Sequence, residues 1–375
     1  MNKRKGYVKR VFPGNNTPKG FYSFYDHIIT PDATRILVIK GGPGVGKSTF
    51  MSKIAEAMVD RGFDIEIHHC SSDNDSVDGV VFPDIGVAII DGTAPHVVDP
   101  KHPGAIDEII HLGDFWDEVE LRKHRDEIVS AGQEMGRCFE RAYRFLRAAK
   151  AVYDDWEAAN LEGLDFGKAN KLADDLIWEV FGAQRVTHKV GRGRRLFASA
   201  ITPDGLKNYL NTIVGRCRKK YIIIGDPGTG KSVLLGKVAQ AALERGYDVE
   251  LYHCPLNPEK IEHVVLEGLS VALVKSIEPH TYQPSPDDTI IDMNDLLSPA
   301  VVKKYEDLIS EDARVFNYLF GRATSFIQMA KSVHDEMEQY YTSCMDFDGI
   351  AALRERTLER ILRYAEEANA PSGRS

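Results

Sequence analysis

The sequence predicts an α/β protein of two tandem domains, each with a three-layer α/β/α core built on a mainly parallel sheet, and each with a helical appendage. A glycine-rich motif occurs twice, as GGPGVGKS from Gly41 and as GDPGTGKS from Gly225. Each copy follows a short apolar run and precedes a segment whose apolar residues have helical spacing. Strands that alternate with helices favour a parallel sheet with right-handed crossovers.

The two motifs belong to an internal repeat that covers most of the chain. Lys47 and Lys231 are 184 positions apart, and the same shift aligns GFDIEIHHC from Gly62 with GYDVELYHC from Gly246. Such a long match in one register indicates duplication and fusion of a single domain. We therefore predict a first domain at residues 1–190 with its helical appendage at about 114–182, and a second domain at 191–375 with its appendage at about 300–368.

The core elements can be placed in each half. The helix after each motif should end at a glycine, Gly62 or Gly246, which suits a helix C-terminus. Upstream, Thr17 and Thr202 each begin a Thr-Pro-x-Gly segment, which predicts a short helix with a threonine N-cap. The strands that we predict lie at residues 36–39, 65–69 and 87–90 in the first half, and at 221–224, 249–253 and 271–274 in the second.

The motif Gly-x-x-x-x-Gly-Lys-Ser suits the binding of a nucleotide's phosphates. Its glycines let backbone N–H groups converge on phosphate oxygens, and the following helix adds its positive end. Lys47 and Lys231 would reach the β- and γ-phosphates, while Ser48 and Ser232 would bind Mg²⁺. The predicted nucleotide-binding residues are Gly41, Gly42, Pro43, Gly44, Val45, Gly46, Lys47, Ser48 and Thr49 in the first loop, and Gly225, Asp226, Pro227, Gly228, Thr229, Gly230, Lys231, Ser232 and Val233 in the second.

These motifs resemble those of the P-loop NTPase superfamily, and they cover the core of both halves. The whole chain is also similar to a poorly characterised bacterial family of tandem P-loop ATPases. The resemblance implies ATP with Mg²⁺ as the ligand, and it adds no further substrate. Asn170-Lys171-Leu172-Ala173 lacks the aspartate of a guanine-reading loop, which favours ATP over GTP.

The acidic residue that should complete such a site differs between the halves. In the first half, the strand at 87–90 is followed by Asp91, which is expected to hold the Mg²⁺ water shell. The equivalent residue of the second half is Lys275, which cannot bind a cation. Glu278 is an alternative acid three residues later. We therefore expect turnover in the first half, with Lys47, Asp91 and His96 as catalytic residues and Ser48, Asp91 and Ser232 as metal ligands.

The segment after Asp91 leaves the reaction open. Asp91-Gly92-Thr93-Ala94-Pro95-His96 resembles the Asp-Gly-x-Pro-Arg segment of nucleoside monophosphate kinases, but it is one residue longer and has histidine in place of arginine. His96 and its counterpart His280 would sense the γ-phosphate or orient water, or else be structural. The polar segment 71–78 would hold a substrate or a second Mg²⁺, or else be a solvated loop.

Two weaker patterns also have both a functional and a structural interpretation. His69-Cys70 and His253-Cys254 end matched strands, where packing is favoured over a metal or thiol site because adjacent residues point to opposite faces. Basic residues near 192–195 and 216–220, with Arg10 matching Arg195, are expected to be a solvated connector rather than an arginine finger.

Composition narrows the class of protein. The net charge is −9, which argues against nucleic-acid partners. The five cysteines are scattered, no apolar run is long enough to span a bilayer, and no secretory signal is apparent, so we expect a cytoplasmic protein without membrane contact. The favoured function is a Mg²⁺-dependent ATPase working mainly in the first half. The alternatives are a small-molecule or nucleotide kinase, and a nucleotide-gated regulatory module without significant turnover. A protein or small-molecule partner and homo-oligomerisation remain open.

Overall fold

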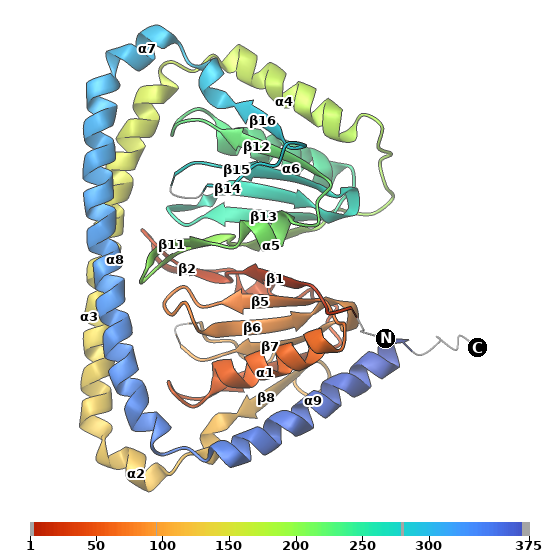
Figure 1. The fold of residues 1–375 in the computed structure, drawn as a ribbon, viewed down its shortest axis with the longest axis vertical. Coiled ribbons are helices and arrows are strands. Elements are labelled where there is room, and N and C mark those ends of the chain that lie inside the picture. The colour runs from red at the N-terminus through yellow and green to blue at the C-terminus, as the bar shows by residue number, and fades with distance from the viewer. Residues whose placement is uncertain (1–3, 95, 279–280, 370–375) are drawn as a thin grey trace. The chain divides into compact units, whose positions relative to one another are not determined.

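The computed structural model describes residues 4–94, 96–278 and 281–369. It divides into two compact units that differ from the predicted boundary at residue 190. The first unit holds the described residues up to Gly14, Ser23–Phe139 and those from Gln328 onward. The second unit holds Asn15–Tyr22 and Glu140–Ile327. Each unit is built on one six-stranded sheet (Figure 1).

The sheet of the first unit contains the three strands that the sequence predicts, and three more. The P-loop-type motif follows β4, which lies between β7 and β8. β6 runs antiparallel to both of its neighbours, whereas the other pairs are parallel. The sheet order is β1 (Val8–Val11), β5 (Ile65–His69), β6 (Val77–Phe82), β7 (Val87–Asp91), β4 (Arg35–Lys40) and β8 (Asp107–His111).

The sheet of the second unit repeats this arrangement. β14 is its antiparallel strand, paired with β13 and β15. The sheet order is β16 (Thr289–Asp292), β12 (Lys219–Ile224), β15 (Val271–Lys275), β14 (Asn257–Leu266), β13 (Val249–Cys254) and β9 (Gly193–Leu196). A mixed, mostly parallel α/β fold is therefore confirmed for both halves.

β6 and β14 are two strands that the sequence pattern did not predict. Short 3₁₀ turns, η2 (Pro83–Ile85) and η4 (Glu267–Leu269), join them to β7 and β15. Connections this short allow only antiparallel pairing, because a parallel crossover needs a dozen or more residues. In the first half, the segment predicted as a polar loop at 71–78 therefore ends inside a strand.

Each glycine-rich motif is followed by the predicted helix. α1 (Lys47–Asp60) and α6 (Lys231–Glu244) both stop two residues before a glycine. Gly62 has a φ of 94° and Gly246 a φ of 79°, a left-handed conformation that favours glycine at a helix C-terminus. The predicted ends of both helices are confirmed.

The two faces of the first sheet are covered differently, so the expected three-layer α/β/α arrangement is only partly present. On one face, α1 and α9 (Phe347–Asn369) form the main core with residues such as Leu37 and Ile89. The neighbouring residues Ile36 and Ala88 point to the opposite face, as strand alternation requires. Among the described residues, the 3₁₀ turn η1 (Tyr25–His27) and Ile28 pack there in place of an α-helix.

The predicted helical stretches are present, but their last helices, α4 and α9, do not pack on the cores of their own halves. They consist of η3 (Leu112–Phe115), α2 (Glu118–Lys123), α3 (Arg125–Leu161) and α4 (Phe166–Phe181), then η5 (Met293–Leu296), α7 (Pro299–Lys304), α8 (Glu306–Thr342) and α9. α4 joins the core of the second unit through residues such as Leu176 and Phe181, whereas α9 joins that of the first through Ile350 and Ile361. The division into units accordingly falls inside α3 and α8.

The Thr-Pro-x-Gly segments form β-hairpins, so the predicted short helices are wrong. β2 (Gly14–Thr17) pairs with β3 (Gly20–Ser23), and β10 (Ser199–Thr202) with β11 (Gly205–Asn208). Thr17 Oγ1 donates to the carbonyl of Gly20 at 2.7 Å, so the threonine closes the turn. After the second hairpin comes a short helix, α5 (Leu210–Val214). Within the described residues, no helix is long and apolar enough to cross a bilayer.

Candidate functional site

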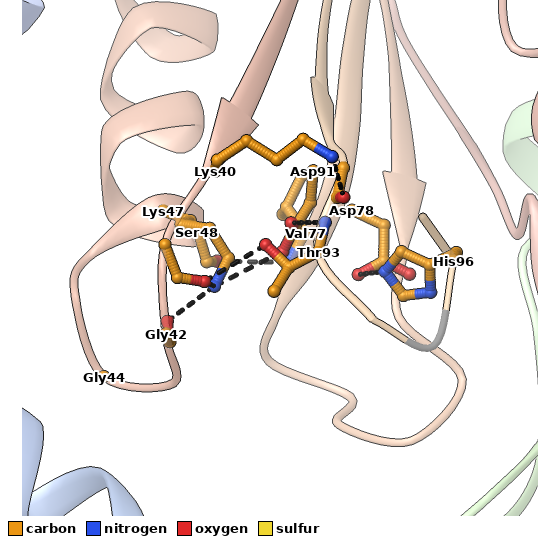
Figure 2. A network of polar contacts seen from close by, with 12 residues as sticks. Lys40, Gly42, Gly44, Lys47, Ser48, Val77, Asp78, Asp91, Thr93 and His96 are labelled. Atoms are coloured by element: carbon orange, nitrogen blue, oxygen red, sulfur yellow. Dashed lines mark hydrogen bonds and ion pairs between the residues drawn. The ribbon is translucent and has the colours of Figure 1, made fainter. Parts of the chain in front are cut away.

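The first glycine loop, Gly41–Ser48, connects β4 to α1 at the carboxyl end of the first sheet (Figure 2). The second glycine loop, Gly225–Ser232, connects β12 to α6 in the same way. Neither helix has a side-chain cap at its N-terminus, so the first-turn N–H groups have no side-chain acceptor there. A helix N-terminus with this geometry attracts anions. Thr49 and Val233, both predicted to bind nucleotide, are exposed in the first turn of the helices.

Glycine is required at two positions of each loop. Gly46 and Gly230 precede the helices with φ values of 87° and 85°, which other residues rarely adopt. A Cβ atom on Gly44 would lie 2.7 Å from the carbonyl oxygen of Glu338. The loop backbone is therefore held closely against a helix.

Lys47 lies inside the first glycine loop. Its Nζ donates to the carbonyl oxygens of Gly41 at 3.1 Å and Gly42 at 2.7 Å. The same atom lies 3.6 Å from Oδ2 of Asp91 at the end of β7. The structure thus brings together two of the residues predicted to be catalytic.

Asp91 and Ser48 are fixed by backbone contacts. Oδ1 of Asp91 accepts from the N–H of Thr93 at 2.8 Å, and Ser48 Oγ accepts from the N–H of Val77 at 3.1 Å. A hydroxyl and a carboxylate next to a phosphate-binding loop are the oxygen donors that Mg²⁺ prefers. The residues present at the first loop therefore fit this ion.

A second carboxyl group, Asp78 on β6, lies beside the first loop. It is 4% exposed, and Tyr25 donates to its Oδ2 at 2.8 Å. Nε2 of His96 lies 3.9 Å from Oδ1, and the imidazole stacks on the Tyr25 ring. Burial raises the pKa of the Asp78 carboxyl; His96 and Tyr25 lower it, and the nearby carboxylate of Asp91 raises it. His96 is therefore part of a buried polar cluster with Asp78 and Tyr25.

Lys231 in the second glycine loop makes the contacts of Lys47 in a more buried setting. Its Nζ donates to the carbonyl oxygens of Gly225 and Asp226 and to Oγ1 of Thr229, at 2.6, 2.5 and 3.0 Å. The residue is only 5% exposed. Burial, together with the positive charge of Lys275, lowers the pKa of Lys231 to about 7.

Lys275 occupies the place that Asp91 has in the first unit. Asp91 pairs with Ile39 in the first sheet, and Lys275 pairs with Ile223 in the second. Ile39 and Ile223 are the next-to-last residues of β4 and β12. Nζ of Lys275 donates to Oε1 of Glu262 at 2.7 Å. Burial lowers the pKa of Lys275, but the carboxylate of Glu262 outweighs it, so the pKa is raised above its usual range. An ammonium offers no lone pair to a metal, so the predicted Mg²⁺ site at Ser232 lacks its partner carboxylate.

The first loop is covered by the end of α8. The N–H of Gly44 donates to Oε1 of Glu338 at 3.1 Å, and Thr342 Oγ1 donates to the carbonyl of Gly44 at 3.4 Å. A Cβ on Gly42 would lie 2.5 Å from the ring of Tyr341. The carboxylate of Glu338 therefore accepts from an N–H group that a bound phosphate would also use.

The end of α3 covers the second loop in a similar way. A Cβ on Gly228 would lie 2.2 Å from the carbonyl oxygen of Glu157, and Asn160 Nδ2 donates to the carbonyl of Pro227 at 2.7 Å. The side chain of Glu157 accepts a hydrogen bond from Lys260, whose Nζ lies 2.5 Å from Oε2. Both covering helices belong to the predicted helical appendages, but their contacts with the glycine loops were not predicted.

The paired histidines at the ends of β5 and β13 contact arginines. Nη1 of Arg10 donates to Nε2 of His69 at 2.8 Å, and Nη1 of Arg195 to Nε2 of His253 at 3.1 Å. Each arginine lies on the strand next to its histidine, in β1 or β9. Both arginines therefore lie in paired strands of a sheet, not in the solvated connector that the sequence predicts.

Other basic residues that were considered as arginine fingers also contact carboxylates. They form the pairs Arg194–Glu250, Lys219–Glu179 and Lys220–Asp288. Burial raises the pKa of the thiols of Cys70 and Cys254, which disfavours thiolate chemistry. His280 lies outside the described residues, and Glu278 is exposed beyond the end of β15.

No protein-family model, curated protein or solved structure matches the chain. The function must therefore be argued from the geometry of the two loops. Two signals in the sequence could have found the missed residues. The shift of 184 that aligns Lys47 with Lys231 also pairs Asp78 with Glu262. A shift of 181 in the helical stretches pairs Glu157 with Glu338.

Proposed function

We propose that this protein binds ATP at both glycine loops and hydrolyses it, with Mg²⁺, at the first loop. The convergence of Lys47, Ser48 and Asp91 at the ends of β4 and β7 carries the proposal. This set combines an ammonium for the phosphates with a hydroxyl and a carboxylate for the cation. As the sequence motifs indicate, the chain would then be a tandem P-loop NTPase.

Each residue of the first loop would have a separate task. The N–H groups of the loop and of the first turn of α1 bind the β-phosphate oxygens, and Lys47 leaves its loop carbonyls for the β- and γ-phosphates. Ser48 and Asp91 would hold Mg²⁺, which when bound offsets negative charge on the phosphates. Hydrolysis places a water oxygen on the γ-phosphorus, breaks its bond to the β-phosphate oxygen, and yields ADP and inorganic phosphate.

Turnover by two matched variants tests this assignment. Lys47→Ala should lower the rate of phosphate release by about a hundredfold or more, because one charged donor to the reacting phosphate is lost. Lys231→Ala should leave the rate within about threefold of the parent, since the second loop lacks a metal-binding acid. If Lys231→Ala abolishes turnover and Lys47→Ala does not, the roles of the loops are reversed.

A specific observation favours phosphoryl transfer to an acceptor as a second candidate. The buried carboxyl of Asp78 lies beside Asp91, and burial raises its pKa. Such a group could accept the proton of an acceptor hydroxyl. ATP consumption that appears only when a metabolite is added identifies a kinase. Phosphate release without an acceptor identifies an ATPase, and ATP binding without consumption identifies a regulatory module.

A further inference from the structure

The two glycine loops differ in the charged groups around them. At the first loop, the Lys47 ammonium lies 3.6 Å from the carboxylate of Asp91, and the carboxyl group of Asp78 lies near Asp91. At the second loop, the Lys275 ammonium pairs with the carboxylate of Glu262, and Lys231 lies near Lys275 and near the carboxylate of Asp226. Lys275 and Glu262 have side chains only 9% and 2% exposed, so solvent screens these charges poorly.

Other charged side chains do not cancel this difference. At the second loop, Lys260 and Glu157 form an ion pair with each other at 2.5 Å. At the first loop, Glu338 adds another carboxylate, bonded to the N–H of Gly44. The first loop is therefore electronegative, whereas at the second loop the ammonium and carboxylate groups balance, with Lys275 at the strand end that carries Asp91 in the first unit.

The charge balance sets what each loop needs in order to bind a polyphosphate. Phosphate brings several negative charges close to Asp91 and Asp78, and a divalent cation is needed to offset the repulsion. At the second loop, Lys275 already supplies a positive charge at the end of the strand where a P-loop site would hold its cation. A cation placed there would be repelled by two ammonium groups.

We infer that the second glycine loop binds the phosphate chain of a nucleotide that carries no divalent metal, with Lys275 in the place of the cation. This inference rests on the proposed function, because it takes nucleotide as the ligand of the loop. Glu262 holds the Lys275 ammonium in position and stabilises its charge. The ammonium has three N–H donors, and its bond to Glu262 uses one of them. The site is then a nucleotide clamp without the means to activate water.

Counting bound ATP by native mass spectrometry, in excess Mg²⁺ and in excess EDTA, tests this inference. Lys47→Ala isolates the second loop, and it should bind one ATP with an affinity that changes by less than about threefold between the two buffers. Lys231→Ala isolates the first loop, and removing Mg²⁺ should weaken its binding by at least about tenfold.

A neutral replacement of the buried pair provides the matched control. Lys275→Met with Glu262→Gln, made in the Lys47→Ala chain, removes both charges together and so avoids leaving one of them unpaired. Binding in EDTA should then fall by at least about tenfold, as expected for loss of one charge-assisted contact. A circular dichroism spectrum equal to that of Lys47→Ala shows that the fold is kept.

The outcomes separate the inference from the proposed function. Binding by Lys47→Ala that requires Mg²⁺, or that occurs in neither buffer, overturns the metal-free clamp. If Lys231→Ala still binds ATP with Mg²⁺ and releases phosphate in that case, the proposed function stands alone. Absence of ATP from every form, including the parent chain, overturns both. If the Lys47→Ala chain binds ATP in EDTA equally well with and without Lys275→Met and Glu262→Gln, Lys275 is not the substitute for the cation.

Discussion

The two glycine loops share a backbone frame and differ in the charges around it. Both follow the same strand position, start a helix at the lysine and have left-handed glycines at matching places. The strand beside each loop ends in Asp91 in one unit and in Lys275 in the other. The comparison shows that the loop motif indicates a ligand class, whereas residues on neighbouring strands determine the chemistry available there.

The replacement in the second unit involves two positions rather than one. A lone lysine in place of Asp91 would be buried without a counter-charge, which is strongly unfavourable. Glu262, in the position of Asp78, supplies that charge at 2.7 Å. Asp78 and Asp91 of the first unit thus correspond to the ion pair Glu262–Lys275 of the second. The members of this ion pair lie on the adjacent strands β14 and β15.

The largest effect is expected when this ion pair is broken on one side. Lys275→Met leaves Glu262 buried and uncompensated, so the local free energy of unfolding should fall by about 3–5 kcal/mol. Lys275→Met with Glu262→Gln should restore most of that loss. Hydrogen–deuterium exchange of peptides from β14 and β15 measures the effect, because it reports the opening of these strands directly.

The first unit provides the comparison for this stability prediction. Asp91→Asn should cost about 1 kcal/mol or less, since Lys47 keeps its bonds to two loop carbonyls and lies in a less buried setting. If Lys275→Met and Asp91→Asn destabilise their sheets equally, the Lys275–Glu262 pair has no special structural role.

A smaller effect is expected where α9 and α4 attach to their sheets. Glu108 on β8 accepts from Arg360 of α9 at 2.8 and 2.5 Å and from Arg35 of β4 at 2.5 Å. Hydrogen bonds from Arg360 outweigh partial burial and, with Arg35, lower the pKa of Glu108 to about 2. Allowing for partial solvent exposure, Glu108→Gln should cost about 1–2 kcal/mol at neutral pH.

The dependence on pH follows from the sign of this shift. The pKa of Glu108 is lower in the folded chain than its ordinary value of 4.5, so the contact stabilises fully above that value. The stabilisation is lost as the pH falls from about 4.5 towards 2, and the difference between parent and Glu108→Gln should disappear in that range. Urea midpoints measured at several pH values check this prediction.

The corresponding pair of the second unit serves as its control. Glu179 of α4 contacts Lys219 of β12 at 2.5 Å, but both side chains are about half exposed, at 50% and 45%. Exposed pairs contribute about 0–1 kcal/mol, so Glu179→Gln should change stability less than Glu108→Gln. A larger loss from Glu179→Gln would contradict the contrast between the two attachments.

The sequence predicts the repeating parts of the fold well. Apolar runs of four to six residues and the glycine motifs determine three strands and one helix in each half, because burial and loop geometry restrict those residues. β6 was missed although Val77, Val80 and Val81 form an apolar strand pattern, since the polar residues before it indicated a loop. Thr17-Pro18 was misassigned because the same residues suit a helix start and a tight turn.

The partners of the long helices could not be predicted from the sequence. The apolar faces of α4 and α9 identify surfaces to be buried, but an amphipathic pattern does not say which sheet it covers. Leu176 and Ile361 lie in the cores of the second and first units respectively, although each helix was assigned to the other domain. Contacts at the loops that depend on these helices, such as Glu338 with Gly44, were missed for the same reason.

The smallest expected effect concerns that contact at the first loop. A carboxylate oxygen of Glu338 accepts from Gly44, an N–H group that a phosphate oxygen would also require. His334 and Asp335 lie close by, with ligand atoms of all three side chains within 4.8 Å of one another. Phosphate must therefore displace a like charge, whereas at the second loop the equivalent Glu157 contacts Lys260 instead.

Glu338→Gln should tighten ATP binding at the first loop by about three- to tenfold, because the amide keeps the shape of the side chain and removes its charge. Isothermal titration of the Lys231→Ala chain isolates this loop. Glu336→Gln makes the same change of charge at an exposed position of α8 and should have little effect. The gain should also shrink at high salt, since part of it is screened electrostatics. Weaker binding in Glu338→Gln would show instead that the carboxylate assists nucleotide binding, and that the two loops differ in a second respect.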